Sequence, residues 1–294
     1  MTTTPATSTP STTSARRGAG TRSALYAVLG TVAALVVTIP LLWAVLRAFQ
    51  TNDTIVSAAT WSQMLDLSGT NFAQILTPSG SLWRALMNSV IVSVATAVLT
   101  AVVATLAGYG LSKFRFRGAG AALSVILLSM MVPFQAILTP LYLEMNAMHL
   151  TDSLLGLVLF STTVNLPFGV FVMKAACDAV PASIEESALM DGAGTVRMLT
   201  TVLRPMLLPG VASAALYAFL ASWTEFLGAL TFITREDLYT LPVALLNLQS
   251  GTFGELDYGL LVAGAVVAMI PCILLYIALQ RFYVQGLAAG AVKG

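Results

Sequence analysis

Six long apolar segments dominate the sequence, and shorter polar stretches separate them. They cover residues 24–48, 86–111, 119–143, 154–173, 206–232 and 259–282. Each reaches about 20 residues, the length that a helix needs to cross the hydrocarbon core of a bilayer. Within each segment, apolar residues would lie on all sides of a helix and not on one face only. The pattern therefore predicts spanning helices and not amphipathic surface helices. We therefore expect an all-α, polytopic membrane protein with six transmembrane helices.

The segment before the first apolar run, residues 1–23, has a different composition. Its first part consists of Ser, Thr, Pro and Ala apart from Met1, and three arginines follow. Such a segment buries too little apolar surface to fold, so we expect a disordered cytoplasmic tail there and a single transmembrane domain over residues 24–294. The run 24–48 is longer than the apolar core of about 7–15 residues in a signal peptide, which predicts a membrane anchor.

Composition supports a membrane protein and excludes several soluble classes. Hydrophobic residues make up 57% of the 294-residue chain, charged residues 9%, and the mean hydropathy is +0.86. Soluble domains carry about 25% charged residues, so this chain lacks the polar groups to cover a soluble globule. The formal net charge of +1 provides no basic field for nucleic acid, and no nucleic-acid partner is expected.

The distribution of positive charge predicts the orientation of the spans. Lys and Arg are enriched in cytoplasmic loops of membrane proteins. With the N-terminus in the cytoplasm, all of the 14 Lys and Arg residues fall on the cytoplasmic side except Arg47, Arg84 and Arg235. Six spans with both termini in the cytoplasm fit this bias.

The chain lacks the residues on which several kinds of catalytic site depend. Cys177 and Cys272 lie in or beside distant apolar segments, and with one histidine, His149, they form no metal-ligand pattern. None of the lysines precedes Ser or Thr, as the end of a phosphate-binding loop requires. We therefore expect a non-catalytic protein with no metal and no cofactor.

The polar stretch between the fourth and fifth apolar segments, loop 181–205, predicts a short helix followed by a turn. Ser183 and Glu186 have the spacing of a capping box, in which each side chain bonds a backbone N–H at the start of a helix. Gly192 and Gly194 then interrupt the helix, because glycine readily takes the positive φ of a sharp turn.

A second short helix is predicted after this turn. Thr195 can cap its start, and Pro205 limits its far end. On these residues alone, two interpretations remain open. Loop 181–205 is either an ordinary surface hairpin or a docking site for a partner protein, with acidic residues at its tip.

The order of residues in loop 181–205 resembles the hallmark cytoplasmic loop of the permease subunits of bacterial ABC importers. That loop contains Glu-Ala-Ala, then three residues and Gly, and it ends in Leu-Pro. The matching residues here are Glu186, Ser187, Ala188, Asp191, Gly192 and Pro205. Ser187 replaces the middle alanine, and Arg204 replaces the aliphatic residue before the proline.

A wider set of motifs, over residues 70–294, resembles the maltose-type, carbohydrate branch of these permeases. Each motif is short, but their order and spacing make the set specific. The motifs are Asn71-Phe72, Asn88-Ser89, Ala107-Gly108-Tyr109, Lys113-Phe114-Arg115-Phe116-Arg117-Gly118, Met130-Met131-Val132-Pro133, Pro140-Leu141-Tyr142, Trp223-Thr224-Glu225-Phe226, Tyr239-Thr240-Leu241-Pro242 and Gly290-Ala291-Val292-Lys293-Gly294.

The resemblance implies a permease subunit of an ATP-driven importer in the bacterial plasma membrane, in contact with lipid. Such a subunit forms half of the translocation pore for a sugar or related carbohydrate, and it pairs with a second permease as a heterodimer. It also implies two cytoplasmic ATP-binding subunits, which hydrolyse the ATP, and an external solute-binding protein. The implied ATPase-docking residues are Glu185, Glu186, Ser187, Ala188, Asp191, Gly192, Arg197 and Pro205.

Three residues are candidates for the translocation pathway. Glu225 is an acid well inside a predicted span, where a charge is costly unless it faces water or a partner group. Trp223, beside it, can stack on a sugar ring, and Asn88 is the third candidate. The alternative for Glu225, a hydrogen bond to a neighbouring helix, is equally open.

A stand-alone secondary transporter of a small polar solute is the alternative function. Such transporters usually contain inverted repeats and several buried charges along an ion path, and the sequence shows neither. In an importer, the outer segments 50–83 and 233–258 are expected to receive the solute-binding protein, since they carry aromatic and acidic residues.

Overall fold

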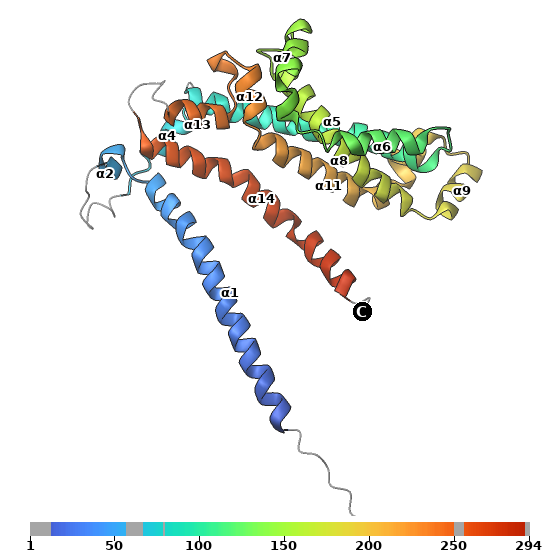
Figure 1. The fold of residues 1–294 in the computed structure, drawn as a ribbon, viewed down its shortest axis with the longest axis horizontal. Helices are drawn as coiled ribbons and strands as arrows, with labels where there is room; N and C mark the ends of the chain where they lie inside the picture. Colours follow the sequence, from blue (N-terminus) through green and yellow to red (C-terminus); the bar gives the residue numbers. More distant parts are fainter. Residues whose placement is uncertain (1–12, 57–66, 79, 250–255, 292–294) are drawn as a thin grey trace, which may run out of the picture.

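The structure is a computed structural model, and it describes residues 13–56, 67–78, 80–249 and 256–291. Within these residues the chain forms helices and no strand, so the all-α prediction is confirmed (Figure 1). The helices are α1 (Thr13–Ala48), α2 (Asn52–Val56), α4 (Thr70–Ile75), α5 (Ser81–Lys113), α6 (Ala119–Ser129), η1 (Phe134–Ile137), α7 (Leu138–Ala147), α8 (Leu154–Asp178), α9 (Ala182–Met190), α10 (Thr195–Arg197), η2 (Met198–Val202), α11 (Arg204–Trp223), α12 (Leu227–Phe232), η3 (Glu236–Leu238), α13 (Leu241–Gln249) and α14 (Tyr258–Ala291).

Five helices in the described part of the chain are long and apolar enough to cross a membrane. They lie within α1, α5, α8, α11 and α14. A sixth candidate is the pair formed by residues 119–129 and 134–147, if the two count as one span. The structure thus contains five or six candidate membrane helices, at the positions that the apolar segments predicted.

The third apolar segment does not form the continuous helix predicted over residues 119–143. α6 ends at Ser129, and the chain bends by 87° before the helical pair η1 and α7 begins at Phe134. Pro133 lies at this break. Proline has no N–H to continue the helix and disfavours the helical conformation in the residue before it. In Figure 1, α7 therefore stands almost upright on the end of α6.

The fifth apolar segment, residues 206–232, also forms two helices where one was predicted. α11 ends at Trp223, and α12 begins at Leu227. Between them lies Glu225, whose carboxylate accepts hydrogen bonds from the backbone at the start of α12. This local capping satisfies N–H groups that a continuous helix would bond internally.

Some predictions fall at or beyond the edge of the described residues. α1 begins at Thr13, within the segment 1–23 that the sequence assigned to a disordered tail, and residues 1–12 lie outside the described residues. Parts of the two outer segments, residues 57–66 and 250–255, lie outside as well. The extent of the tail and the role of these segments therefore stay predictions.

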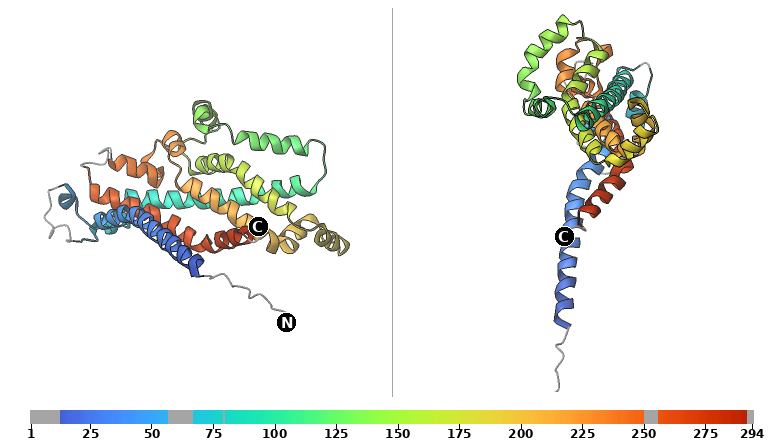
Figure 2. Two further views of the ribbon diagram at one scale, coloured as in Figure 1. Left: turned by 60° about the horizontal axis from the view of Figure 1, so that its bottom comes forward. Right: turned by 90° about the vertical axis from the view of Figure 1, so that its right-hand side faces the viewer.

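The centre of the molecule is a bundle of α5, α8 and α11, which run side by side in both Figures 1 and 2. Small residues bring the helix backbones close together. A Cβ built on Gly108 of α5 would lie 2.7 Å from the backbone nitrogen of Lys174 in α8, and one on Gly169 would lie 3.0 Å from the Cβ of Ala104. Close backbone approach at small residues is a main source of helix association in membranes.

The bundle has two distinct ends, which we name after the helices found there. The α9 end carries loop 181–205, and the α13 end carries α4 and α13 (Figure 1). η3 also lies towards the α13 end, since Asn88 of α5 contacts it. α1 and α14 meet near the α13 end and then diverge from the bundle. The most apolar part of α1 is not buried against this chain, although Ala48 at the end of the helix is. Most of the α1 surface is therefore available to lipid or to another chain.

Two glycines of α5 provide a test of the packing. Gly108→Ala is expected to lower the free energy of unfolding in detergent by about 1–3 kcal/mol, because the added methyl group overlaps the α8 backbone. Gly110→Ala is the matched control. No atom lies within 4 Å of its built Cβ, so higher helix propensity should leave stability unchanged or raise it by up to about 1 kcal/mol. Equal effects of the two substitutions would contradict this packing.

Candidate functional site

Loop 181–205 forms two short helices around a turn, as predicted, but their N-termini differ from the prediction. α9 begins at Ala182, directly after Pro181, so Ser183 already lies inside the helix and no side chain caps the helix start. The predicted capping box is therefore wrong. Thr195 is likewise the first helical residue after Gly194, and it does not act as a cap. The N-cap positions are instead Pro181 and Gly194, whose ψ angles of 133° and 167° are extended.

The turn after α9 is a Schellman motif. The N–H of Ala193 bonds the carbonyl of Ala188 at 2.9 Å, and the N–H of Gly192 bonds that of Leu189 at 3.0 Å. Gly192 has φ +76°, which a residue with a Cβ rarely adopts, while the space around it is open. The prediction that a glycine makes this turn is confirmed at Gly192, and backbone conformation is the reason for glycine there.

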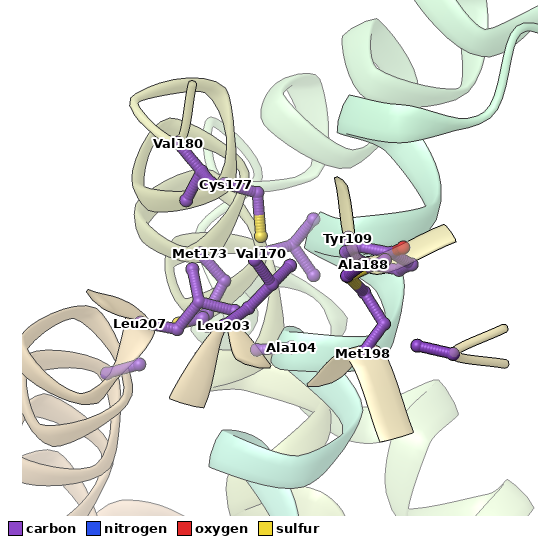
Figure 3. Packing of buried hydrophobic residues seen from close by; sticks show 12 residues of the cluster. Ala104, Tyr109, Val170, Met173, Cys177, Val180, Ala188, Met198, Leu203 and Leu207 are labelled. Carbon is purple, nitrogen blue, oxygen red and sulfur yellow. The ribbon is translucent and has the colours of Figure 1, made fainter. Parts of the chain in front are cut away.

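The inner side of the loop is fixed on the ends of α5 and α8. Ala188, Met198 and Leu203 are buried, and they belong to one hydrophobic cluster with Tyr109 of α5 and Met173 of α8 (Figure 3). The chain after α9 includes a π-helix, η2, in which the N–H of Leu203 bonds the carbonyl of Met198. Buried apolar side chains therefore hold the loop in one position on the bundle.

Most of the residues predicted for docking are exposed on the outer side of the loop. The exposed ones are Glu186, Ser187, Asp191, Gly192, Arg197 and Pro205. Their surface also contains exposed apolar side chains, of which Met190 is 89% exposed. Acidic and apolar groups thus share the tip of the loop, which is typical of a surface that contacts another protein.

Two of the predicted docking residues face the bundle instead. Ala188 belongs to the buried cluster. The carboxylate of Glu185 pairs with the ammonium of Lys113, the last residue of α5, and the two side chains are only 14% and 17% exposed. Direct docking through Glu185 or Ala188 is therefore not supported by the geometry of the free subunit.

Further polar contacts join the same end of α5 to α8. The hydroxyl of Ser112 donates to Asp178 Oδ1 at 2.6 Å, and Lys174 Nζ donates to Asp178 Oδ2 at 2.7 Å. Lys113 Nζ also donates to the carbonyl of Val180, at 3.3 Å. At the α9 end, Lys113 and Lys174 therefore each have an acidic partner, whereas Glu186, Asp191 and Arg197 are exposed on the loop.

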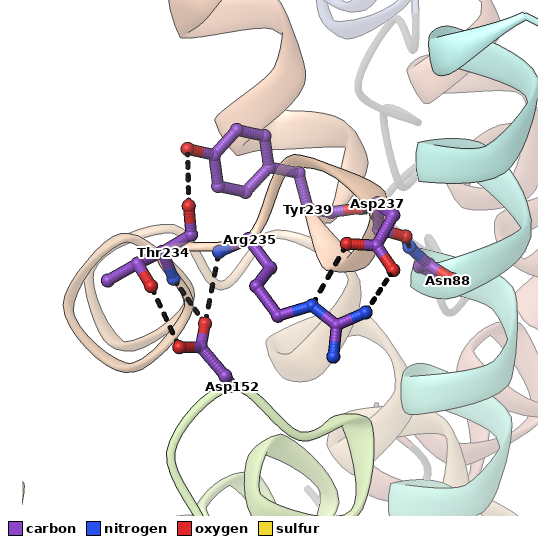
Figure 4. A network of polar contacts seen from close by, with 6 residues as sticks. All are labelled: Asn88, Asp152, Thr234, Arg235, Asp237 and Tyr239. Carbon is purple, nitrogen blue, oxygen red and sulfur yellow. Dashed lines mark hydrogen bonds and ion pairs between the residues drawn. The ribbon is translucent and has the colours of Figure 1, made fainter.

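At the α13 end, α5 holds the segment between α12 and α13. The side-chain nitrogen of Asn88 donates to the carbonyls of Asp237 and Tyr239, both at 3.0 Å (Figure 4). The hydroxyl of Ser89 accepts from the N–H of Leu241 at 2.8 Å. Asn88 is buried, and its side chain is engaged by this segment, so it offers no open face to a solute in this conformation.

Asp152 fixes the same segment from the other side. Its carboxylate accepts from the N–H and the hydroxyl of Thr234, at 2.6 and 2.7 Å, and from the N–H of Arg235 at 3.0 Å (Figure 4). The hydrogen bond from the Thr234 backbone is the largest of the effects that lower the pKa of Asp152 below its ordinary value. The loop before α8 is thereby tied to the chain after α12.

This contact predicts a pH dependence. Because its pKa is lowered on folding, Asp152 stabilises the protein above the ordinary aspartate range, and this contribution is lost as the pH falls through the folded-state pKa. Asp152→Asn should lower the thermal unfolding temperature at neutral pH, and the difference from wild type should shrink as the pH falls below the ordinary aspartate range. Glu144→Gln, on exposed α7, is the control for loss of a carboxylate. A difference that stays constant with pH would contradict the prediction.

The other two pathway candidates lie where α11 ends. The indole N–H of Trp223 donates to the carbonyl of Ala268 in α14 at 2.9 Å, and the ring stacks on Phe219. Trp223 is buried but forms part of the wall of an open, apolar cavity of about 450 Å³ between α11, α13 and α14. The Trp223 ring therefore borders a cavity between helices, while its indole nitrogen is already bonded to Ala268.

Glu225 caps the next helix. Its Oε1 accepts from the N–H of Gly228 at 2.7 Å and its Oε2 from the N–H of Ala229 at 2.9 Å. Of the two interpretations left open by the sequence, this contact favours the hydrogen-bonding one. The carboxylate holds α12, and a Cβ built on Gly228 would lie 2.3 Å from Phe160 of α8, so α12 packs directly on the bundle.

Sequence reasoning missed two of these features. It did not assign a role to Lys113, although the residue was part of a quoted motif, and it did not single out Asp152. Each has its partner 72 or more positions away, as the pairs Lys113–Glu185 and Asp152–Thr234 show. No local pattern signals such contacts.

Comparisons with known proteins match most of the chain. The family model described as "Binding-protein-dependent transport system inner membrane component" matches residues 100–288. The chain is 31% identical to the trehalose transport system permease protein of Mycobacterium tuberculosis, over 94% of this chain and 100% of the relative. It is also 31% identical to the diacetylchitobiose uptake system permease protein of Streptomyces coelicolor, over 87% of this chain and 91% of the relative.

A solved structure has the same fold. It is described as a bacterial ABC transporter involved in the import of the acidic polysaccharide alginate. The match has a TM-score of 0.78, covers 94% of this chain and 100% of the other, and has 22% sequence identity. At this identity the match shows a shared fold.

Proposed function

The chain belongs to the family of binding-protein-dependent transport system inner membrane components, and from this premise we propose that it imports a carbohydrate with energy from a separate ATPase. The resemblance found in the sequence is confirmed by this membership. The protein is an ABC importer permease, a multi-pass protein of the bacterial plasma membrane. The proposal concerns its substrate, its orientation, its partners and the residues that serve them.

The substrate is a sugar or a related carbohydrate. Three relatives are named as uptake or transport systems for trehalose, diacetylchitobiose and arabinooligosaccharides. All three are saccharides of two or more units, which supports the same substrate class for this chain.

The permease forms half of a pore in a heterodimer with a second permease subunit. In this arrangement the α9 end faces the cytoplasm, both termini are cytoplasmic, and the bent pair α6 and η1–α7 counts as the third of six spans. The distribution of Lys and Arg supports this orientation. The unburied apolar surface of α1 supports a further membrane-embedded neighbour.

The single observation that carries the proposed energy coupling is the exposed tip of loop 181–205. Glu186, Asp191 and Arg197 are exposed there beside the Met190 side chain, on a turn that Gly192 holds in one shape. A rigid, exposed loop of this kind can transmit force from one of the two subunits that bind and hydrolyse ATP. Glu185 and Ala188 hold loop 181–205 in place from its inner side.

The three pathway candidates support the pathway indirectly, because their polar atoms bond backbone groups of the protein and not the solute. Trp223 anchors α14, Glu225 caps α12, and Asn88 holds the segment before α13. Together they set the shape of the α13 end, where an external solute-binding protein would deliver the carbohydrate.

The proposal is tested by purifying the full chain from its bacterial host and identifying the proteins that accompany it. An importer subunit should bring down an ATP-binding subunit and a second permease. The solute-binding protein of the same system is then screened by thermal shift against neutral oligosaccharides, polyols and glycerol phosphates. Binding of saccharides is the expected result. Solute uptake by the purified chain alone, without ATP, would instead establish a secondary transporter.

A further inference from the structure

α5 runs the length of the bundle and is attached at both of its ends. Its last residue, Lys113, contacts the docking loop, and Asn88 and Ser89 near its start contact the segment before α13. With 33 residues and a rise of about 1.5 Å per residue, the helix spans roughly 50 Å. One helix therefore touches both surfaces that an importer has to coordinate.

The attachment at the α9 end is an ion pair shielded from water. Lys113 and Glu185 retain 17% and 14% side-chain exposure, so solvent and salt screen their attraction much less than that of a surface pair. The same ammonium donates to the carbonyl of Val180, just before α9. Lys113 thus contacts the chain both before α9 and within it.

The helical spacing of α9 separates the roles of its two adjacent acids. Glu185 lies three positions before buried Ala188 and therefore on the same face of the helix, towards the bundle. Glu186, one position further, is exposed at the tip. Lys113 therefore contacts the same inward face of α9 that Ala188 buries, and it leaves the face with Glu186 to a partner.

The middle of α5 has little freedom to bend independently of α8. Gly108 leaves the two backbones in contact, and Gly169 packs on Thr100 and Ala104. A movement imposed at Lys113 is therefore passed along a closely packed helix pair to Asn88.

We infer that Lys113 is a positioning residue that locks the docking loop to α5, so that α5 carries the loop's movement to the segment 233–249 at the α13 end. This inference rests on the proposed function, because it assigns the loop as the ATPase contact. It predicts that the loop tip and the segment 233–249 move as one body through the transport cycle.

The experiment measures the distance between the two ends of this body. Spin labels are placed on Thr201→Cys in loop 181–205, outside the proposed docking residues, and on Glu236→Cys in η3, both exposed positions. Cys272 is replaced by alanine, and buried Cys177 is retained. The full complex with its ATP-binding subunits is placed in lipid nanodiscs, and distances are recorded without nucleotide and with ATP plus vanadate.

With Lys113 in place, a single narrow distance is expected that does not change on addition of ATP plus vanadate. Lys113→Ala should lose this single distance and give a broad, nucleotide-dependent distribution. The double exchange Lys113→Glu with Glu185→Lys should restore the narrow distance. Restoration by exchanged charges distinguishes positioning by the ion pair from a simple loss of packing.

Lys174→Ala is the matched control, because it removes a lysine of the same end whose ion pair with Asp178 lies within α8. It should keep the narrow distance. The inference is overturned if Lys113→Ala keeps it too, if Lys174→Ala loses it equally, or if the charge exchange fails to restore it. If Lys113→Ala does not fold, the charge-exchange variant decides the question by the same criterion. Absence of an ATP-binding subunit from the wild-type complex would instead refute the proposed function.

Discussion

Glu186→Lys is expected to release the ATP-binding subunits and to lower carbohydrate uptake by about tenfold or more, while the chain still inserts and folds. Glu186 is exposed on the outer face of α9 and contributes nothing to the hydrophobic cluster beneath the loop. Reversing its charge therefore changes the docking surface and leaves the bundle intact. Placing like charges against each other at an interface costs several kcal/mol, and each 1.4 kcal/mol lowers affinity tenfold.

The measurement is the ratio of ATP-binding subunit to permease in the purified complex, together with uptake by intact cells. Glu236→Lys is the matched control, since it makes the same charge change on an exposed residue at the α13 end. It should leave the ratio at its wild-type value. If Glu186→Lys also retains the wild-type ratio and uptake, loop 181–205 is not the docking site.

The sequence predicted the helices and the glycine turn, because both depend on local properties. The length of each apolar segment determines whether it can span a bilayer, and the positive φ of Gly192 follows from the need for a tight turn after α9. The breaks in the third and fifth segments were not predicted. Their hydropathy is continuous, and a proline such as Pro133 either kinks a membrane helix or ends it, depending on what packs around it.

The roles of single polar residues were harder to predict than the fold. Glu185 and Glu186 are adjacent in sequence and were assigned one role, yet they point in different directions because successive residues of a helix are about 100° apart. Which of them faces inward depends on residues of other helices, namely Lys113, which pairs with Glu185, and the cluster that buries Ala188. Asn88 and Glu225 similarly bond backbone groups whose positions become known only when the helices are assembled.

Glu225→Leu is expected to lower uptake by about tenfold or more without preventing membrane insertion. Leucine cannot accept the hydrogen bonds that the carboxylate receives from Gly228 and Ala229. Each buried N–H left without a partner costs about 1–3 kcal/mol. The cost falls on α12. The effect passes on because the backbone N–H of Asp152 donates to the carbonyl of Phe232, the last residue of α12, and the Asp152 carboxylate holds the chain that follows at Thr234.

Two further substitutions separate capping from other effects at this position. Glu225→Gln keeps one acceptor oxygen, so it should reduce uptake less than Glu225→Leu does. Thr224→Ala is the control, because the Thr224 hydroxyl is exposed and bonds only within its own helix, to Leu220. Its uptake should stay close to wild type, measured alongside the amount of each variant in the membrane. If Glu225→Leu keeps wild-type uptake, the cap on α12 plays no part in transport. If all three variants lose uptake, the α11–α12 junction is sensitive to any substitution. The capping role thus requires a graded order, with leucine most damaging, glutamine intermediate and Thr224→Ala harmless.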